Sequence, residues 1–136
     1  MIEKYKQVTC SCKTCQEMCK ERPCWPTPQE SEKLIKNGFA KKLMYDYWAA
    51  IGGEDIGIIS PAIVGHEGSN APFWPVGRCV FLDENNLCKL HDLGLKPFEG
   101  RMADCKNPTK NLHEDTAMTW DTPEGKDVVK LWKNNV

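Results

Sequence analysis

Several features that would narrow the function of a chain are missing from these 136 residues. No apolar stretch approaches the roughly 18 residues that a membrane-spanning helix requires. No excess of basic charge is present, because 18 Lys and Arg face 19 Asp and Glu for a net charge of −1. Dedicated nucleic-acid binders usually carry a clear basic excess. We therefore expect no membrane span and no nucleic-acid partner.

Targeting signals are also missing. Residues 1–6 lack the apolar core of a secretion signal, and residues 133–136 carry no lipidation motif. We therefore expect a cytoplasmic protein. Clustered cysteines in that reducing compartment are more often metal-binding or catalytic than disulfide-bonded. A framework of four disulfides is the alternative that the even cysteine count permits.

Familiar catalytic and ligand-binding motifs are incomplete. His66-Glu67 lacks the second histidine of a zinc-protease helix, and residues 52–57 lack the Lys-Ser/Thr of a phosphate loop. Residues 83–86 lack the glycine and distal glutamate of an EF-hand, so we expect a turn there. His113 is expected on the surface of a helix. No residue can be assigned a catalytic role, and whether the protein is an enzyme stays open.

The cysteines are the most informative residues present. Five fall within residues 10–24, and three follow within residues 79–105 after a cysteine-free gap of 54 residues, 25–78. Thiolates crowded at one end of a chain cannot easily pair only with each other. We expect the two packets to converge on one or two metal ions, with these candidate ligands: Cys10, Cys12, Cys15, Cys19, Cys24, Cys79, Cys88 and Cys105.

The spacing within the first packet suits a metal. Cys12 and Cys15 form a C-x2-C pair, and Cys19 follows four positions later, on the same face of a helical turn. Cys105 would return from a loop to complete a four-sulfur site. Zinc prefers four thiolates in a closed tetrahedron, and iron–sulfur clusters also take four cysteines. Zinc is the first choice, with iron or an iron–sulfur cluster as the alternative.

Local patterns predict where regular structure lies. Thr27, Pro28 and Glu30 form a helix start with a capping box, and Asn37-Gly38 ends that helix. A second helix is expected over residues 40–50. One or two short strands are expected within residues 56–64.

The second half has its own signals. Residues 78–82 and 87–90 flank a polar turn and predict a β-hairpin that places Cys79 and Cys88 on opposite arms. Two helices are expected in a C-terminal tail of about residues 108–136, the last capped by Asp121 or Thr122 with Pro123 in its first turn. Together these elements predict one α+β domain over residues 1–136, small and helix-rich, with a short β-hairpin and a cysteine-ligated metal.

Residues 77–83 and 87–91 resemble the C-x-F-L … C-x-I-Y pattern of the YkgJ-type cysteine-cluster family. Lys96-Pro97 and Cys105-Lys106 resemble later elements of that family, and its N-terminal cysteine cluster matches the following residues: Cys12, Cys15 and Cys19. The resemblance covers most of residues 8–106 and implies a zinc- or iron-chelating domain. A related cysteine pattern in flagellin lysine-N-methylases implies that an enzyme role is conceivable.

Three departures from the family pattern bear on the ligands. The chain has no adjacent cysteine pair, which leaves Cys24 or Cys10 as the fourth N-terminal ligand. Sixteen residues separate Cys88 from Cys105, more than the family's usual interval. His91 replaces the family's tyrosine and offers a mixed Cys88-x2-His91 pair, although a packing or solvent-facing role for His91 is favoured.

These observations predict a cytoplasmic metal-binding protein that acts as an interaction or adaptor module with a protein partner. The competing hypothesis is an enzyme that uses an iron or iron–sulfur site for redox or modification chemistry. A metal carrier is a third hypothesis. An adaptor needs closed four-sulfur coordination, whereas an enzyme needs an open coordination position or a pocket with convergent polar groups.

Overall fold

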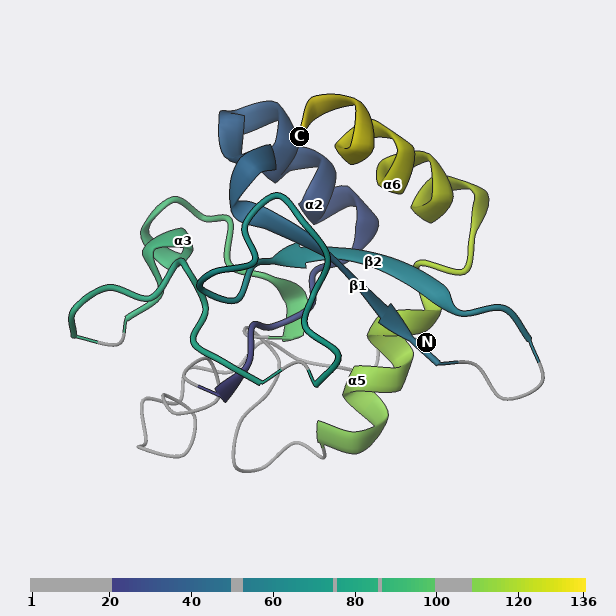
Figure 1. Ribbon diagram of the computed structural model, residues 1–136, viewed down its shortest axis with the longest axis horizontal. Coiled ribbons are helices and arrows are strands. Elements are labelled where there is room, and N and C mark those ends of the chain that lie inside the picture. The colour runs from purple at the N-terminus through teal and green to yellow at the C-terminus, as the bar shows by residue number, and fades with distance from the viewer. Residues whose placement is uncertain (1–20, 50–52, 75, 86, 100–108) are drawn as a thin grey trace.

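The protein is described by a computed structural model that places residues 21–49, 53–74, 76–85, 87–99 and 109–136. Two antiparallel strands, β1 (Leu43–Trp48) and β2 (Ile56–Pro61), form a sheet whose register pairs Leu43 with Pro61 and Trp48 with Ile56. Helices α2 (Pro28–Leu34) and α6 (Pro123–Asn135) lie side by side on one side of the strands, and α5 (Thr109–Met118) lies on the other (Figure 1). The described residues form a mixed α+β fold.

The first helix begins as its sequence predicts. The Thr27 side chain accepts a hydrogen bond from the Glu30 N–H, and the Glu30 carboxylate accepts one from the Thr27 N–H at 2.9 Å. This capping box satisfies backbone donors that a helix start otherwise leaves without partners. A π-helical turn, η2 (Ile35–Phe39), continues the helix, and Gly38 turns the chain at φ 89°. The predicted end at Asn37-Gly38 is therefore confirmed to within the final turn.

The expected second helix over residues 40–50 is wrong. A short 3-10 turn, η3 (Ala40–Lys42), leads directly into strand β1. The helical spacing of Leu43 and Tyr47 fits strand alternation equally well, and short apolar runs do not distinguish the two periods. Aromatic side chains such as Tyr45, Tyr47 and Trp48 favour strands. Pairing with β2 along one edge of β1, together with hydrogen bonds to residues 68–71 along the other edge, satisfies the backbone of this segment.

The core lies between the sheet and the helices that cover it. Its buried members include Leu34 and Ile35 from the first helix, Ile58 and Ile59 from β2, and residues from α5, α6 and the loops. The Ser31 hydroxyl donates to the Ile59 carbonyl at 2.6 Å and ties α2 to β2. These contacts fix the strand pair beneath α2.

Two tryptophans, Trp120 in the turn between α5 and α6 and Trp132 in α6, bond to backbone carbonyls far earlier in the sequence. The Trp120 indole N–H donates to the Pro26 carbonyl at 2.8 Å, and the Trp132 indole N–H donates to the Ala40 carbonyl at 2.9 Å. Both indoles are almost wholly buried. The prediction of two helices in the tail is confirmed, and Thr122 caps α6 by accepting from the Gly125 N–H at 3.0 Å.

Candidate functional site

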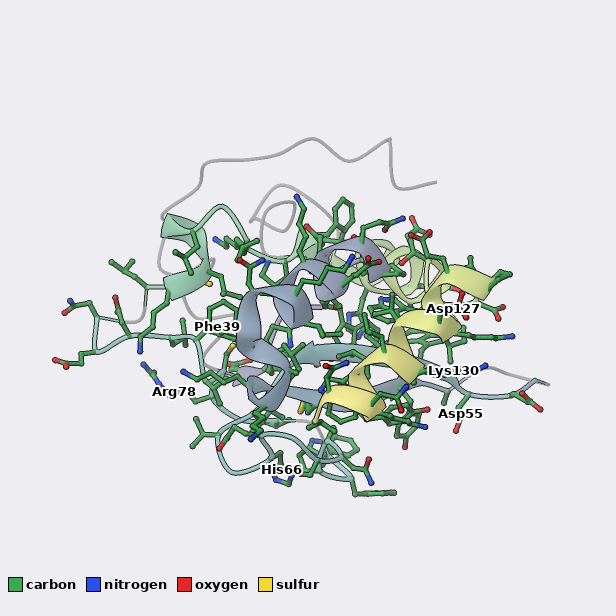
Figure 2. All side chains as sticks on the ribbon, turned by 90° about the horizontal axis from the view of Figure 1, so that it is seen from above. Phe39, Asp55, His66, Arg78, Asp127 and Lys130 are labelled. Atoms are coloured by element: carbon green, nitrogen blue, oxygen red, sulfur yellow. The ribbon has the colours of Figure 1, made fainter. Side chains whose placement is uncertain are left out.

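Cys79 lies on an extended segment beside the sheet. It forms an isolated antiparallel bridge with Ile63, just beyond the end of β2, and the Val64 N–H donates to the Arg78 carbonyl at 2.9 Å. The Arg78 guanidinium donates to the Asp83 carbonyl at 2.6 Å. Figure 2 shows Arg78 far from Asp127 and Lys130 of α6. Cys79 is buried and belongs to the main core.

Cys88 follows a turn held by one carboxylate. Asp83 Oδ1 accepts from the N–H groups of Asn85 and Leu87, at 2.8 and 3.0 Å. The turn brings Cys88 opposite Leu82 in a second isolated bridge. The predicted hairpin is therefore only partly correct: the two arms meet at this bridge, and the chain then turns into a short helix, α3 (Lys89–Asp92), instead of pairing further.

Cys24 lies on a segment that two distant parts of the chain hold in place. The Gly77 N–H donates to the Glu21 carbonyl at 2.6 Å. On the other side of Cys24, the Glu99 N–H donates to the Trp25 carbonyl at 3.2 Å, and the Trp25 N–H donates to Glu99 Oε1 at 2.5 Å. The end of the first cysteine packet is thus bonded to the chain just before the second packet, at Gly77, and within the second packet, at Glu99. We call residues 21–25 with these contacts the packet junction.

The three described cysteines carry thiols, not cystine bridges. Cys24 and Cys79 are buried, and Cys88 is partly exposed. The other predicted ligands lie outside the described residues: Cys10, Cys12, Cys15, Cys19 and Cys105. Within the placed parts of the chain, no group of three or more His, Cys, Asp or Glu side chains has the arrangement of a metal site. The assignment of the eight cysteines as ligands therefore stays a prediction.

The donor chemistry nevertheless suits a soft or borderline metal. Thiolates are preferred ligands of zinc and of iron–sulfur clusters. The thiols of Cys24 and Cys79 lie in water-poor surroundings, where a bound cation would neutralise the thiolate charge. Thiolates from separate chain segments would hold such a metal, and binding it would link those segments.

A buried polar cluster adjoins the packet junction. Glu99 Oε2 pairs with Nδ1 of His113 from α5, and the His113 ring stacks on the Trp25 indole with centroids 3.6 Å apart. The same indole donates through Nε1 to the buried Asp46 carboxylate at 3.0 Å. Trp48 meets the imidazole edge-to-face, with centroids 5.5 Å apart. The cluster thus contains five side chains from four parts of the chain, and three of them, Glu99, Trp25 and Trp48, contact the imidazole.

The expectation that His113 is a surface residue of a helix is wrong. Its side chain is only 22% exposed, because Trp25 covers one face and Glu99 holds one nitrogen. Neither cysteine spacing nor helical periodicity could have identified this cluster. The one available signal was the position of Trp25, directly after Cys24.

The other histidines lie in simpler surroundings. His66 is on the loop that follows β2 (Figure 2), and its Nδ1 lies 3.1 Å from the Asn70 carbonyl. The backbone of His91 belongs to α3. A ligand role for His91 beside Cys88 is not tested by this placement and stays a prediction.

The described helices include none that is long and apolar enough to cross a lipid bilayer. Comparisons with protein-family models, curated proteins and solved structures returned no match. The resemblance to the YkgJ-type cysteine-cluster family therefore stays a prediction from the residues that carry it.

Proposed function

We propose that this chain is a metal-binding cysteine-cluster protein. Zinc is the first choice of metal, and iron or an iron–sulfur cluster is the alternative. The metal stabilises a module that interacts with another protein in the cytoplasm. The packet junction is the observation that carries the proposal, because it joins the two cysteine packets through backbone hydrogen bonds within the described residues.

The two residues that are hydrogen-bonded at the packet junction lie close in sequence to cysteines of both packets. Glu21 follows Cys19 by two positions, and Gly77 precedes Cys79 by two positions. Two residues extend at most about 7 Å. The Gly77–Glu21 hydrogen bond therefore tethers the two packets to each other, although 54 residues separate Cys24 from Cys79 in the sequence. Such a tether lowers the entropic cost of gathering ligands from both packets.

Metal analysis tests this proposal directly. The full chain is purified without oxygen, zinc, iron and acid-labile sulfide are measured, and the absorption spectrum is recorded. We expect zinc in a fixed ratio to protein. A brown sample containing iron and sulfide would replace zinc with the iron–sulfur alternative, and a folded protein without bound metal would refute the proposal.

Substitutions separate ligands from core residues. We expect Cys79→Ser and Cys88→Ser each to lower metal content and stability together, since site formation and folding are linked. Leu82→Ala is the matched control, because Leu82 is buried on the same loop and carries no ligand atom. This control should lose stability yet keep the metal-to-protein ratio of the wild type. Full metal content in both cysteine variants would show that neither Cys79 nor Cys88 is a ligand.

One loop supports the interaction role. Phe73 is 91% exposed, Trp74 is 74% exposed, and Val76 is also exposed, all within four positions. Large apolar side chains gathered on a surface often mark protein-binding sites. The same loop leads into Gly77 of the packet junction, so a metal that orders the junction also fixes the base of this loop.

A photo-crosslinking residue in place of Trp74 tests the interaction role in cells. The same residue in place of Leu93, which is also exposed, is the control. We expect one protein to be crosslinked from position 74 only. Added wild-type protein should compete for it, and the Phe73→Ser/Trp74→Ser variant should not. Equal crosslinking from both positions would contradict a specific surface.

A further inference from the structure

The loop that follows β2 is anchored along the free edge of β1. We call residues 64–74 and 76 the aromatic loop. In its first half, the Tyr45 N–H donates to the Ser69 carbonyl at 3.0 Å, and the Ala71 N–H donates to the Tyr45 carbonyl at 2.8 Å. Figure 2 shows His66, in the same half, at the periphery of the molecule. The strand pair therefore fixes the direction in which the rest of the loop leaves the fold.

The second half of the loop carries the most exposed apolar side chains of the described residues. Phe73 is 91% exposed and Trp74 is 74% exposed. The Val76 N–H donates to the Trp74 carbonyl at 2.7 Å, and Gly77 then joins the packet junction. The two aromatic side chains thus stand on a backbone that is held on both sides. A tip held in this way loses little conformational freedom when it binds.

The same segment carries no charge. Residues 68–77 include no Asp, Glu, Lys or Arg, in a chain of which 27% of the residues are charged. Interfaces between identical chains have apolar cores that are depleted in charged residues. Around a two-fold axis a residue near the axis faces its own copy, so a charge there would meet a like charge. An uncharged, aromatic segment avoids that repulsion.

We propose that the aromatic loop binds the same loop of a second copy of this chain around a two-fold axis. Aromatic side chains bury about 150–250 Å² each, so Phe73 and Trp74 alone offer roughly 250–400 Å² at their observed exposures. Val64 and Val76, each 58% exposed, extend this apolar area. A specific interface of standard size needs about 800 Å² per partner, and the loop supplies the apolar centre of such an interface. This inference rests on the interaction role proposed for the loop and names its partner.

The charges around the loop favour a second copy over a lipid surface. Membrane-binding segments combine apolar side chains with Lys and Arg that are attracted to anionic lipids. Residues 64–78 contain one acidic residue, Glu67, and one basic residue, Arg78, so their charges balance. The Arg78 guanidinium also donates to the Asp83 carbonyl at 2.6 Å. A transient contact with a different protein fits less well, because such interfaces are about as apolar as the rest of a protein surface.

Analytical ultracentrifugation of the full chain, purified without oxygen and kept in a reducing buffer, tests for the dimer. We expect a concentration-dependent equilibrium between monomer and dimer. Phe73→Ser/Trp74→Ser should raise its Kd at least about 30-fold, the effect of losing one aromatic hot spot. The matched control is Leu87→Ser/Leu93→Ser, which replaces two exposed apolar side chains outside the loop and should leave Kd unchanged.

All four substituted side chains are exposed, so both double variants should stay folded, which circular dichroism checks. A wild-type chain that stays monomeric at every concentration would overturn the inference. Equal Kd values in the two variants would overturn it as well. Either failure can occur in a chain that holds its metal, so the metal analysis separates failure of the dimer from failure of the proposed metal-binding function.

Photo-crosslinking of the purified chain locates the contact. A photo-reactive residue in place of Val76 leaves both aromatic side chains intact. We expect covalent dimers in which peptides from residues 64–77 of the two copies are joined, as two-fold symmetry requires. Joining to a different surface would overturn the two-fold contact. A monomer that sediments with vesicles of phosphatidylserine and phosphatidylcholine would overturn it in favour of a lipid surface. Crosslinking in cells to a different protein alone would keep the interaction role and overturn the second copy as partner.

Discussion

Replacing Gly77 by alanine tests the packet junction at the residue that donates to the Glu21 carbonyl. A Cβ at this position would lie 2.5 Å from Cγ2 of Ile63, far inside van der Waals contact. Ile63 is buried and β-branched, so its side chain has little freedom to move aside. The chain at residue 77 must shift instead. That shift would strain or break the hydrogen bond from the Gly77 N–H to the Glu21 carbonyl.

The size of the effect follows from these two contacts. Overpacking in a well-packed region typically costs about 1–3 kcal/mol. Loss of one backbone hydrogen bond adds about 1 kcal/mol. We therefore expect Gly77→Ala to lower the free energy of unfolding by about 2–4 kcal/mol, a large part of the stability of a small domain. Because the junction tethers the packets, the variant should also release its metal to a chelator faster than the wild type.

Urea unfolding of the metal-loaded protein, followed by circular dichroism, measures the change in stability. Metal release is followed with a coloured chelator under native conditions. Val76→Ala is the control, since Val76 precedes Gly77 and is exposed, so its truncation should change stability by less than about 0.5 kcal/mol. Equal stability and equal release rates in the two variants would refute the reasoning about the junction.

Three further predictions follow from the described contacts. Glu30→Ala removes an acceptor that the Thr27 and Phe98 N–H groups each use at 2.9 Å, so urea unfolding should show a free energy of unfolding lower by about 2–4 kcal/mol. The control is Glu32→Ala, which removes only a surface ion pair with Lys36 and should lower the free energy of unfolding by less than about 0.5 kcal/mol. Trp132→Phe removes the indole N–H that donates to the Ala40 carbonyl, 92 positions earlier, and should lower the free energy of unfolding by about 1–3 kcal/mol. A smaller decrease than that of the control Val136→Ala would contradict the role of this hydrogen bond. Chelation of the proposed metal should lower Tm in scanning calorimetry, because metal binding and folding are linked, and an unchanged Tm would argue against a structural metal.

Local signals predicted the fold where a few neighbouring residues decide it. The capping box at Thr27 and Glu30 placed the start of α2, and Thr122 with Pro123 placed the start of α6. The prediction of a helix over residues 40–50 is wrong because the apolar spacing of this segment fits both periods, and only pairing with β2 decides between them. Tertiary contacts outweighed local preference in that segment.

The candidate site was less predictable than the helices. Cysteine spacing singled out the packets, but no spacing rule connects Glu99 with His113 or either of them with Trp25. The contacts among these residues cross 74 positions from Trp25 to Glu99 and 14 from Glu99 to His113. Such a cluster depends on how helix α5 packs against the sheet, which a single sequence does not reveal.

The long-range bonds of Trp120 and Trp132 bear on how the protein is made. Trp120 and Trp132 follow all eight cysteines in the sequence and are therefore synthesised after them. Their indole N–H groups donate to the carbonyls of Pro26 and Ala40, which are synthesised much earlier. The core cannot close until α5 and α6 have emerged. During translation Cys79 therefore emerges before Trp120 and Trp132, which belong to the same buried core, so its thiol is covered only after the last described helix has docked.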